Sequence, residues 1–347
     1  MKLIKKVTGI DISKDSITVC FGTQDDALVK KYSKSYTFSN DVKGFKKLIN
    51  LVNNIDVFRS EDKNIPIWFV VEATGVYYEN LAYFLSENKY SVSVILPNKM
   101  KNFFKTLDNK SKTDSLDSAG IAQFGIEKTL KQWEAPSALY KELKELTREL
   151  VSTTEMKSQL KNKLHAKEYS HDANTQTVNR IKKQIAFFEK QIKLIKEQIK
   201  ELVKSDKDLD DRVKNITTAQ GIGFITAVTV ISETNGFCMI ENQRQLTSYA
   251  GYEPRQNDSG TFKGKTPISK KGNKYIRAAV YLPALSAARW NEPLKRVYKR
   301  LCISKNNKKV ALVAVARKLL ILIYTLWKKN QVFDVNYKHG YKTIAST

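Results

Sequence analysis

Two acidic residues stand where acidic side chains are costly unless a cation offsets them. Asp11 lies near the end of the apolar-rich segment 7–12, and Glu72 directly follows the continuous apolar run 67–71. Both segments have the composition of buried strands. Burying an unpaired carboxylate is strongly unfavourable, so acids at the ends of buried strands are typical of metal sites.

Two further acids, Asp114 and Asp117, are three residues apart, which on a helix places both on one face. Four converging carboxylates would hold two divalent ions, and Mg²⁺ suits such oxygen ligands. Two ions about 4 Å apart activate the attacking oxygen and stabilise the leaving oxygen of a phosphodiester. Asp114 also has a structural interpretation as a helix N-terminal acid, and Asp117 has one as a solvated helix residue.

The elements that must position these acids alternate between strands and helices after an opening hairpin, which is typical of an α/β domain. We assign this domain to residues 1–136. The predicted strands are 7–12, 16–21, 67–71 and 92–96, and the predicted helices are 42–52, 78–88 and one that begins near Thr113.

The middle region, residues 137–215, has the heptad periodicity of a coiled coil. A turn at 170–174 separates a weaker seam from a stronger one. Two interpretations stay open: a helical hairpin within one chain, and pairing with a second chain. The narrow apolar stripe favours a role in oligomerisation. The stronger seam consists of Val178, Ile181, Ile185, Phe188, Ile192, Ile195, Ile199 and Leu202.

The charge of the chain predicts a polyanionic partner. The 347 residues carry a formal net charge of +25, and residues 252–347 alone hold 21 basic and 4 acidic side chains. A surplus confined to one region indicates phosphate contacts. A membrane is disfavoured, because Arg317 interrupts the longest apolar stretch, 310–327, which is predicted to be a buried helix. Three widely spaced cysteines exclude a disulfide framework and fit a reducing cytoplasm.

The third region, residues 216–347, opens with a glycine motif that precedes an apolar helix. Gly221 and Gly223 resemble a helix-hairpin-helix element, in which backbone N–H groups hold a DNA phosphate. A glycine turn before a buried helix explains the same residues equally well.

A polar loop at 256–266 and a basic segment at 268–277 follow. Ser259 and Ser269 are candidate nucleophiles, although a lone loop serine is usually a turn former. The chain has no complete phosphate-binding glycine loop, so any reaction on DNA should proceed without ATP. The residues predicted to contact nucleic acid here are Lys263, Lys265, Ser269, Lys270, Lys271, Asn273, Lys274 and Arg277.

Together these motifs resemble the IS110-type insertion-sequence transposases over nearly the whole chain. Asp11 in Gly-Ile-Asp-Ile-Ser-Lys, Glu72 in Val-Glu-Ala-Thr-Gly, and the acids of Lys-Thr-Asp-Ser-Leu-Asp (112–117) match the DEDD motif of the family. The segments 250–260 and 268–277 resemble its C-terminal transposase domain.

The resemblance implies an RNase H-like (RuvC-like) N-terminal domain that holds Mg²⁺, a coiled coil that assembles a dimer or tetramer, and a mainly α-helical C-terminal domain. It implies that Ser259 attacks a DNA phosphate to form a phosphoserine, followed by strand exchange between donor and target double-stranded DNA. It also implies a structured bridge RNA that pairs with both DNAs, so that base pairing provides the sequence specificity. The expected location is the bacterial cytoplasm, on the nucleoid.

Two other functions compete with this one. A two-metal nuclease such as a Holliday-junction resolvase would use the same four acids with water as the nucleophile, and would form no protein–DNA adduct. A non-enzymatic nucleic-acid-binding protein would need neither the acids nor Mg²⁺. The ordered set of carboxylates argues against the second, and the Ser-Gly loop with its basic region argues against the first.

Overall fold

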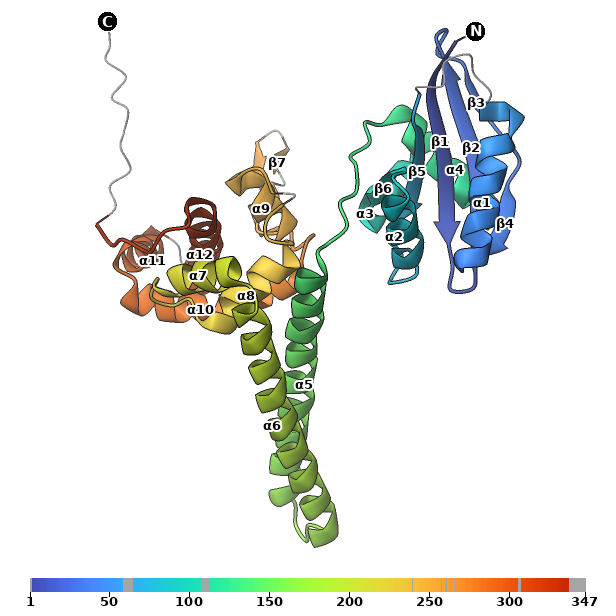
Figure 1. Cartoon of the computed structure of the whole chain (residues 1–347). Helices are drawn as coiled ribbons and strands as arrows, with labels where there is room; N and C mark the ends of the chain where they lie inside the picture. The colour runs from blue at the N-terminus through green and yellow to red at the C-terminus, as the bar shows by residue number, and fades with distance from the viewer. Residues whose placement is uncertain are drawn as a thin grey trace, which may run out of the picture. The chain divides into compact units, whose positions relative to one another are not determined.

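The computed structural model divides the chain into two compact units, residues 1–135 and residues 136–347. Each unit has its own hydrophobic core, and each is described by itself (Figure 1). The residues that the structure describes are 2–58, 65–107, 113–238, 240–256, 258–259, 261–264, 266–304 and 307–336.

The first unit is built on a mixed β-sheet with the strand order β3-β2-β1-β5-β6, in which β4 also pairs with β2. β1 is antiparallel to β2 and parallel to β5, and β5 is parallel to β6. The predicted α/β domain is confirmed, and the arrangement is compatible with an RNase H-like domain. The strands are β1 (Leu3–Ile12), β2 (Ser16–Asp25), β3 (Lys30–Tyr32), β4 (Tyr36–Ser39), β5 (Ile67–Glu72) and β6 (Ser91–Ile95).

Helices cover both faces of this sheet. Because successive strand side chains point to opposite faces, β1 contributes Ile10 to one core and Val7 to the other. The first core packs against α1 and α2, and the second packs against α3 and α4. The helices are α1 (Val42–Asn54), α2 (Glu79–Glu87), α3 (Pro97–Phe104) and α4 (Asp114–Glu127), with a 3-10 turn at Asp56–Phe58.

A close approach of backbones fixes α4 on the sheet. A Cβ atom on Gly9 would lie 2.2 Å from the backbone nitrogen of Ala122 and 2.5 Å from the carbonyl oxygen of Ser118. A Cβ atom on Gly125 would lie 2.5 Å from the Val7 side chain. These two glycines therefore let the helix lie against β1 at a distance that no larger residue permits.

The second unit begins with a long helical hairpin of α5 (Ala138–Glu168) and α6 (Thr175–Lys204), which lie side by side (Figure 1). The predicted turn at 170–174 is confirmed, and the Asn174 side chain caps α6 by accepting from the Thr177 nitrogen. The single chain thus forms the intramolecular hairpin, and pairing with a second chain stays a prediction. The buried seam residues of α6 are Ile181, Ile192, Ile195 and Ile199.

In the residues that the structure describes, six helices and one small hairpin complete the second unit. The helices share one core with the N-terminal part of α5 and the C-terminal part of α6. The elements are α7 (Lys207–Thr217), α8 (Phe224–Glu233), α9 (Gln243–Tyr249), β7 (Asp258–Ser259), β8 (Phe262–Lys263), α10 (Lys274–Trp290), α11 (Glu292–Ser304) and α12 (Lys308–Lys329).

Helix α12 is the one helix in the described part of the chain that is long and apolar enough to cross a membrane by length and composition. It instead packs along its length against α7, α9, α10 and α11. One face of the helix is buried in the core of the unit, and its residues are Ala311, Leu312, Val315, Ala316, Leu319, Leu320, Ile323, Tyr324, Leu326 and Trp327. The predicted buried helix at 310–327 is therefore confirmed.

The contact between Gly9 and α4 generates a prediction for stability. Gly9→Ser should lower the free energy of unfolding by about 1–3 kcal/mol, because the new side chain must displace a helix backbone. Gly223→Ser is the matched control, since a Cβ atom there has no neighbour within 4 Å. Urea unfolding of both variants checks this, and equal stability for the two would contradict the close approach.

Candidate functional site

The carboxyl ends of β1 and β5 bring two of the predicted acids together. The strands are parallel with Ile10 opposite Val71, so Asp11 and Glu72 come next in the same register. Two residues earlier, Gly9 and Val70 both face α4. Because strand side chains alternate, Asp11 and Glu72 face that side as well. Both are half-buried.

Helix α4 runs antiparallel to β1, and its first turn carries the other two acids. Gly125 near its end contacts Val7, whereas Ser118 contacts Gly9, so the helix begins on the side of Asp11. Asp114 and Asp117 lie in the first turn, Asp114 exposed and Asp117 half-buried. The sheet and the helix thus direct all four acids to one end of the unit.

The start of α4 is held in place by hydroxyl groups. The Thr113 Oγ1 atom accepts from the Leu116 nitrogen at 3.3 Å and caps the helix. The Ser35 hydroxyl, between β3 and β4, lies 2.8 Å from the Ser115 hydroxyl and 3.3 Å from that of Ser118. These bonds fix the helix terminus that carries Asp114.

The four carboxylates offer eight hard oxygen atoms, a donor set that fits Mg²⁺. In the described part of the chain, no three His, Cys, Asp or Glu side chains are close enough to hold one ion together. The backbone therefore brings the acids to one edge without packing them into a closed cluster. Like charges at short distance repel, so carboxylates close up only around cations.

Ser259 lies near the tip of a β-hairpin that leaves the helical core at residues 253–269. The segment 256–266 is predicted from the sequence to be a loop, and the structure adds the two short strands β7 and β8 there. The base of the hairpin is fixed by the bond from the Ser269 nitrogen to the Glu253 carbonyl oxygen at 2.7 Å. The Ser259 side chain is exposed, and the neighbouring Asp258 carboxylate accepts from the Gly264 nitrogen at 3.2 Å.

The basic segment after the hairpin is strained at one lysine. Lys270 adopts a left-handed backbone with a φ of 53°, and its nitrogen donates to the Gly251 carbonyl oxygen at 3.1 Å. This conformation is uncommon for residues with a side chain and is often found at functional sites. Lys270, Lys271 and Lys274 are exposed, so their ammonium groups are accessible to phosphates.

Other predicted contact residues have structural partners. The Arg277 guanidinium donates to the Ala250 and Asn273 carbonyl oxygens at 2.8 and 3.2 Å. Ser269 is half-buried. Lys265 lies outside the described residues, and of Lys263 the structure describes only the backbone in β8.

The glycines before α8 play different parts. Gly221 has a φ of +96°, and a Cβ atom on it would lie 2.7 Å from the Ala287 nitrogen of α10, so its first role is packing. Gly223 is exposed and occupies the N-cap of α8 without a side-chain cap. Gly223 is therefore the glycine of this pair whose surroundings leave space for a phosphate.

A buried carboxylate that sequence analysis missed positions the basic segment. Glu233 is 2% exposed, and its two oxygens accept from the Arg148 guanidinium at 2.6 and 2.9 Å. The Asn273 amide donates to the same carboxylate at 2.7 Å, while its oxygen caps α10 by accepting from the nitrogens of Tyr275 and Ile276. Asn273 therefore joins α8 to the first turn of α10.

Aromatic side chains complete this network. The Arg148 guanidinium lies 4.5 Å from the centre of the Tyr275 ring, a cation–π contact. The Tyr249 hydroxyl donates to the Glu233 carbonyl oxygen at 3.0 Å, and burial raises the pKa of Tyr249. The hydrogen bonds that the Arg148 guanidinium donates to Glu233 raise the pKa of Arg148. The one sequence signal for this site was an acid at the end of the apolar helix 224–233.

Comparisons with known proteins match both units. Residues 8–167 match a family model for the DEDD transposase domain of IS110-type elements, described as "Transposase". Residues 213–299 match the model described as "Transposase IS116/IS110/IS902 family". The chain belongs to the IS110 family of transposases. It is therefore a DNA transposase, an enzyme whose substrates are DNA.

Two curated relatives of this transposase cover almost its full length, and a third covers part of it. A pilin gene-inverting protein of Moraxella bovis is 25% identical over 95% of this chain and 98% of its own. The protein of the same name from Moraxella lacunata is 27% identical over the same shares. The transposase for insertion sequence element IS1111A of Coxiella burnetii is 27% identical over 38% of this chain and 37% of its own.

The ion pair between the buried Glu233 carboxylate and Arg148, whose side chain is 41% exposed, generates the second prediction. Arg148→Met should destabilise the second unit by about 3–5 kcal/mol, because it leaves the Glu233 carboxylate buried without its cation. The double variant Arg148→Met/Glu233→Met should recover part of this loss, since no buried charge remains. Chemical denaturation measures the loss of unfolding free energy in Arg148→Met, in Glu233→Met and in the double variant. A loss in the double variant that exceeds the sum of the two single losses would contradict the pairing.

Proposed function

We infer that this transposase recombines DNA through a phosphoserine on Ser259, assisted by Mg²⁺ held by Asp11, Glu72, Asp114 and Asp117. The observation that carries the proposal is the shared register of β1 and β5, which sets two of these acids side by side next to the first turn of α4. In this proposal the first unit is a RuvC-like nuclease domain. Two bound Mg²⁺ ions would supply activation of the nucleophile and stabilisation of the leaving oxygen.

The proposed reaction transfers a phosphoryl group and conserves the energy of the bond. The Ser259 Oγ atom attacks a DNA phosphorus, the bond between phosphorus and the 3′-oxygen breaks, and the serine proton is replaced by the new phosphoester bond. The 3′-oxygen takes up a proton and leaves as a free hydroxyl. Attack by a 3′-hydroxyl of the partner DNA reverses these steps and releases the serine. No nucleotide cofactor is needed, because the ester retains the phosphodiester energy.

Ser259 and the four acids belong to different compact units, so the reaction requires them to meet at one phosphate, within a chain or between protomers. We expect a homo-oligomer, a dimer or tetramer, assembled through the helical hairpin. Apolar side chains that stay exposed on the hairpin support this, namely Met156, Phe187 and Leu194.

Sequence specificity in this proposal comes from a bridge RNA that pairs with donor and target DNA. The basic surplus of residues 252–347 supports a role in holding nucleic-acid backbones. The exposed Lys270, Lys271 and Lys274 would contact phosphates there, next to the base of the Ser259 hairpin. The cytoplasm, on the nucleoid, is the compartment in which such substrates occur.

The serine mechanism has a direct chemical test. The purified protein with its co-purified RNA, Mg²⁺ and supercoiled DNA carrying the joined element ends should give, after digestion, a nucleotide bound to Ser259 in mass spectrometry. Ser259→Ala should abolish the adduct and strand transfer while DNA affinity stays within about twofold. Ser269→Ala tests the second candidate nucleophile and should keep the adduct on Ser259. An adduct that persists in Ser259→Ala would refute the assignment.

The carboxylate site has an independent test. Asp11→Asn keeps the size of the side chain but removes a charged metal ligand, so Mg²⁺-dependent cleavage should fall by at least about a hundredfold. Asp15→Asn, in the turn after β1, is the control and should retain activity. Cleavage that disappears in Asp11→Asn without any serine adduct in the wild type would instead indicate hydrolysis by a two-metal nuclease.

A further inference from the structure

An open pocket of about 520 Å³ lies between α9 and α12. Its lining residues are Asn242, Gln243, Arg244, Arg317 and Ile321. Four of these five side chains carry hydrogen-bond donors, and none is acidic. A pocket of this composition suits an anion and not an apolar ligand.

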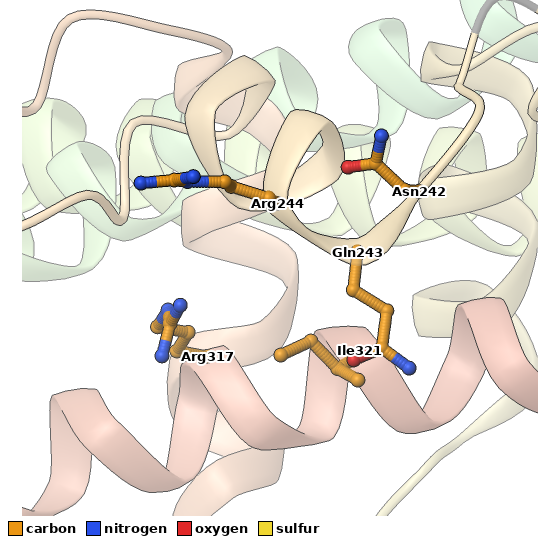
Figure 2. Close-up of a pocket in the computed structure, with 5 residues that line it drawn as sticks. All are labelled: Asn242, Gln243, Arg244, Arg317 and Ile321. Atoms are coloured by element: carbon orange, nitrogen blue, oxygen red, sulfur yellow. The ribbon is translucent and has the colours of Figure 1, made fainter.

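Figure 2 shows how the two arginines are arranged. Arg244 extends from α9 and Arg317 stands on α12, and their guanidinium groups lie toward the same side of the pocket. Among the residues that the structure describes, neither side chain makes a hydrogen bond or an ion pair. Two like charges that share a pocket repel each other, and an anion between them removes that repulsion.

Arg317 is the more informative of the two. It interrupts a helix whose neighbouring residues, Ala316 and Leu319, are fully buried. Its Nε atom is buried and has no hydrogen-bond partner. A buried donor without an acceptor is unfavourable for the folded protein, so this atom lacks a partner that a ligand would provide.

The ligand chemistry follows from the donors. A guanidinium binds phosphate oxygens through two parallel N–H bonds. Figure 2 shows the amide groups of Asn242 and Gln243 on the opposite side of the pocket from the two guanidinium groups, so the arginines are the donors that would hold the anion. Arg317 belongs to the strongly basic region 252–347, and Arg244 precedes it. Nucleic-acid backbones present phosphate groups in this form, whereas isolated small anions would not need an open pocket.

We propose that Arg244 and Arg317 grip one backbone phosphate of a bound nucleic acid, at a second anchoring point apart from the Lys270–Lys271 segment. The proposal rests on the proposed function, since it assumes that the protein carries DNA and RNA. It assigns these arginines to binding and positioning and not to the chemical step. The anchoring point would fix the direction in which a strand leaves the hairpin region.

The test uses the full chain without Mg²⁺, so that binding is measured without cleavage. The probes are a fluorescently labelled duplex DNA of arbitrary sequence and an RNA hairpin of equal length, each titrated at several salt concentrations. Arg317→Gln and Arg244→Gln should each weaken binding about tenfold and lower the salt slope by about one. Arg300→Gln, which removes an exposed charge on α11 outside the pocket, is the matched control and should have a much smaller effect.

The double variant tests whether the two arginines hold the same phosphate. Arg244→Gln/Arg317→Gln should weaken binding by much less than the product of the two single effects. Once one arginine is removed the phosphate is no longer held, so removing the other arginine costs little more affinity. Arg317→Lys should restore only part of the affinity, since lysine has no fork of parallel donors. A loss on the DNA probe alone or on the RNA probe alone identifies the strand that the pocket holds.

A stability measurement excludes a purely structural role. Arg317→Met should leave the melting temperature unchanged or raise it, because the Nε atom has no partner to lose. A large fall in melting temperature, or binding by the pocket variants equal to that of Arg300→Gln, would overturn the proposal. If the wild type binds the probes and these variants bind them equally well, the pocket proposal is refuted and the proposed function is not. If the wild type binds neither probe, both are refuted.

Discussion

The buried carboxylate of Glu233 is the constraint on which the second unit depends. It is desolvated where α5, α8 and the start of α10 meet, and it is stable there only because Arg148 and Asn273 donate three hydrogen bonds to it. Each partner comes from a different segment, so the charge requires all of them to be in place together. The helical hairpin is thereby joined to the loop that precedes α10, and the orientation of the basic segment follows from a single desolvated charge.

In the first unit, the position of a helix on the sheet depends on a close backbone contact, whereas the second unit depends on a buried charge. Gly9 and Gly125 allow α4 to touch β1, and that contact sets which end of the sheet the acidic first turn of the helix faces. The carboxylates themselves are exposed or half-buried and are not packed together. The rigid part of each unit is therefore the scaffold, whereas the groups that would meet DNA, including Ser259, lie at the edges of the scaffold where they can still adjust to a substrate.

Local patterns in the sequence were sufficient for the strands that carry Asp11 and Glu72, for the turn at 170–174 and for the buried helix at 310–327. Strand β3 is exposed throughout and has no alternation to reveal it. Strand β4 does alternate, with Tyr36 and Phe38 against the core, but it has only four residues, and the strands beside Ser259 have only two. The partners of Glu233 are 85 and 40 residues away in the chain, and such pairings leave no trace in local periodicity. Arg317 was visible as an interruption of an apolar stretch, but only the packing of α12 shows that its Nε atom is left without a partner.

The hairpin that carries Ser259 has a consequence for how this family can vary. Among the residues that the structure describes, residues 253–255 pair with residues 267–269 at its base, and Asp258, Ser259 and Phe262 near its tip are exposed. Because side chains alternate along a strand, lengthening both arms by two residues would move the serine outward on the same face, whereas a change of one would turn it to the opposite face. The reach of the serine can therefore diverge in discrete steps between related elements while the core that supports it stays the same.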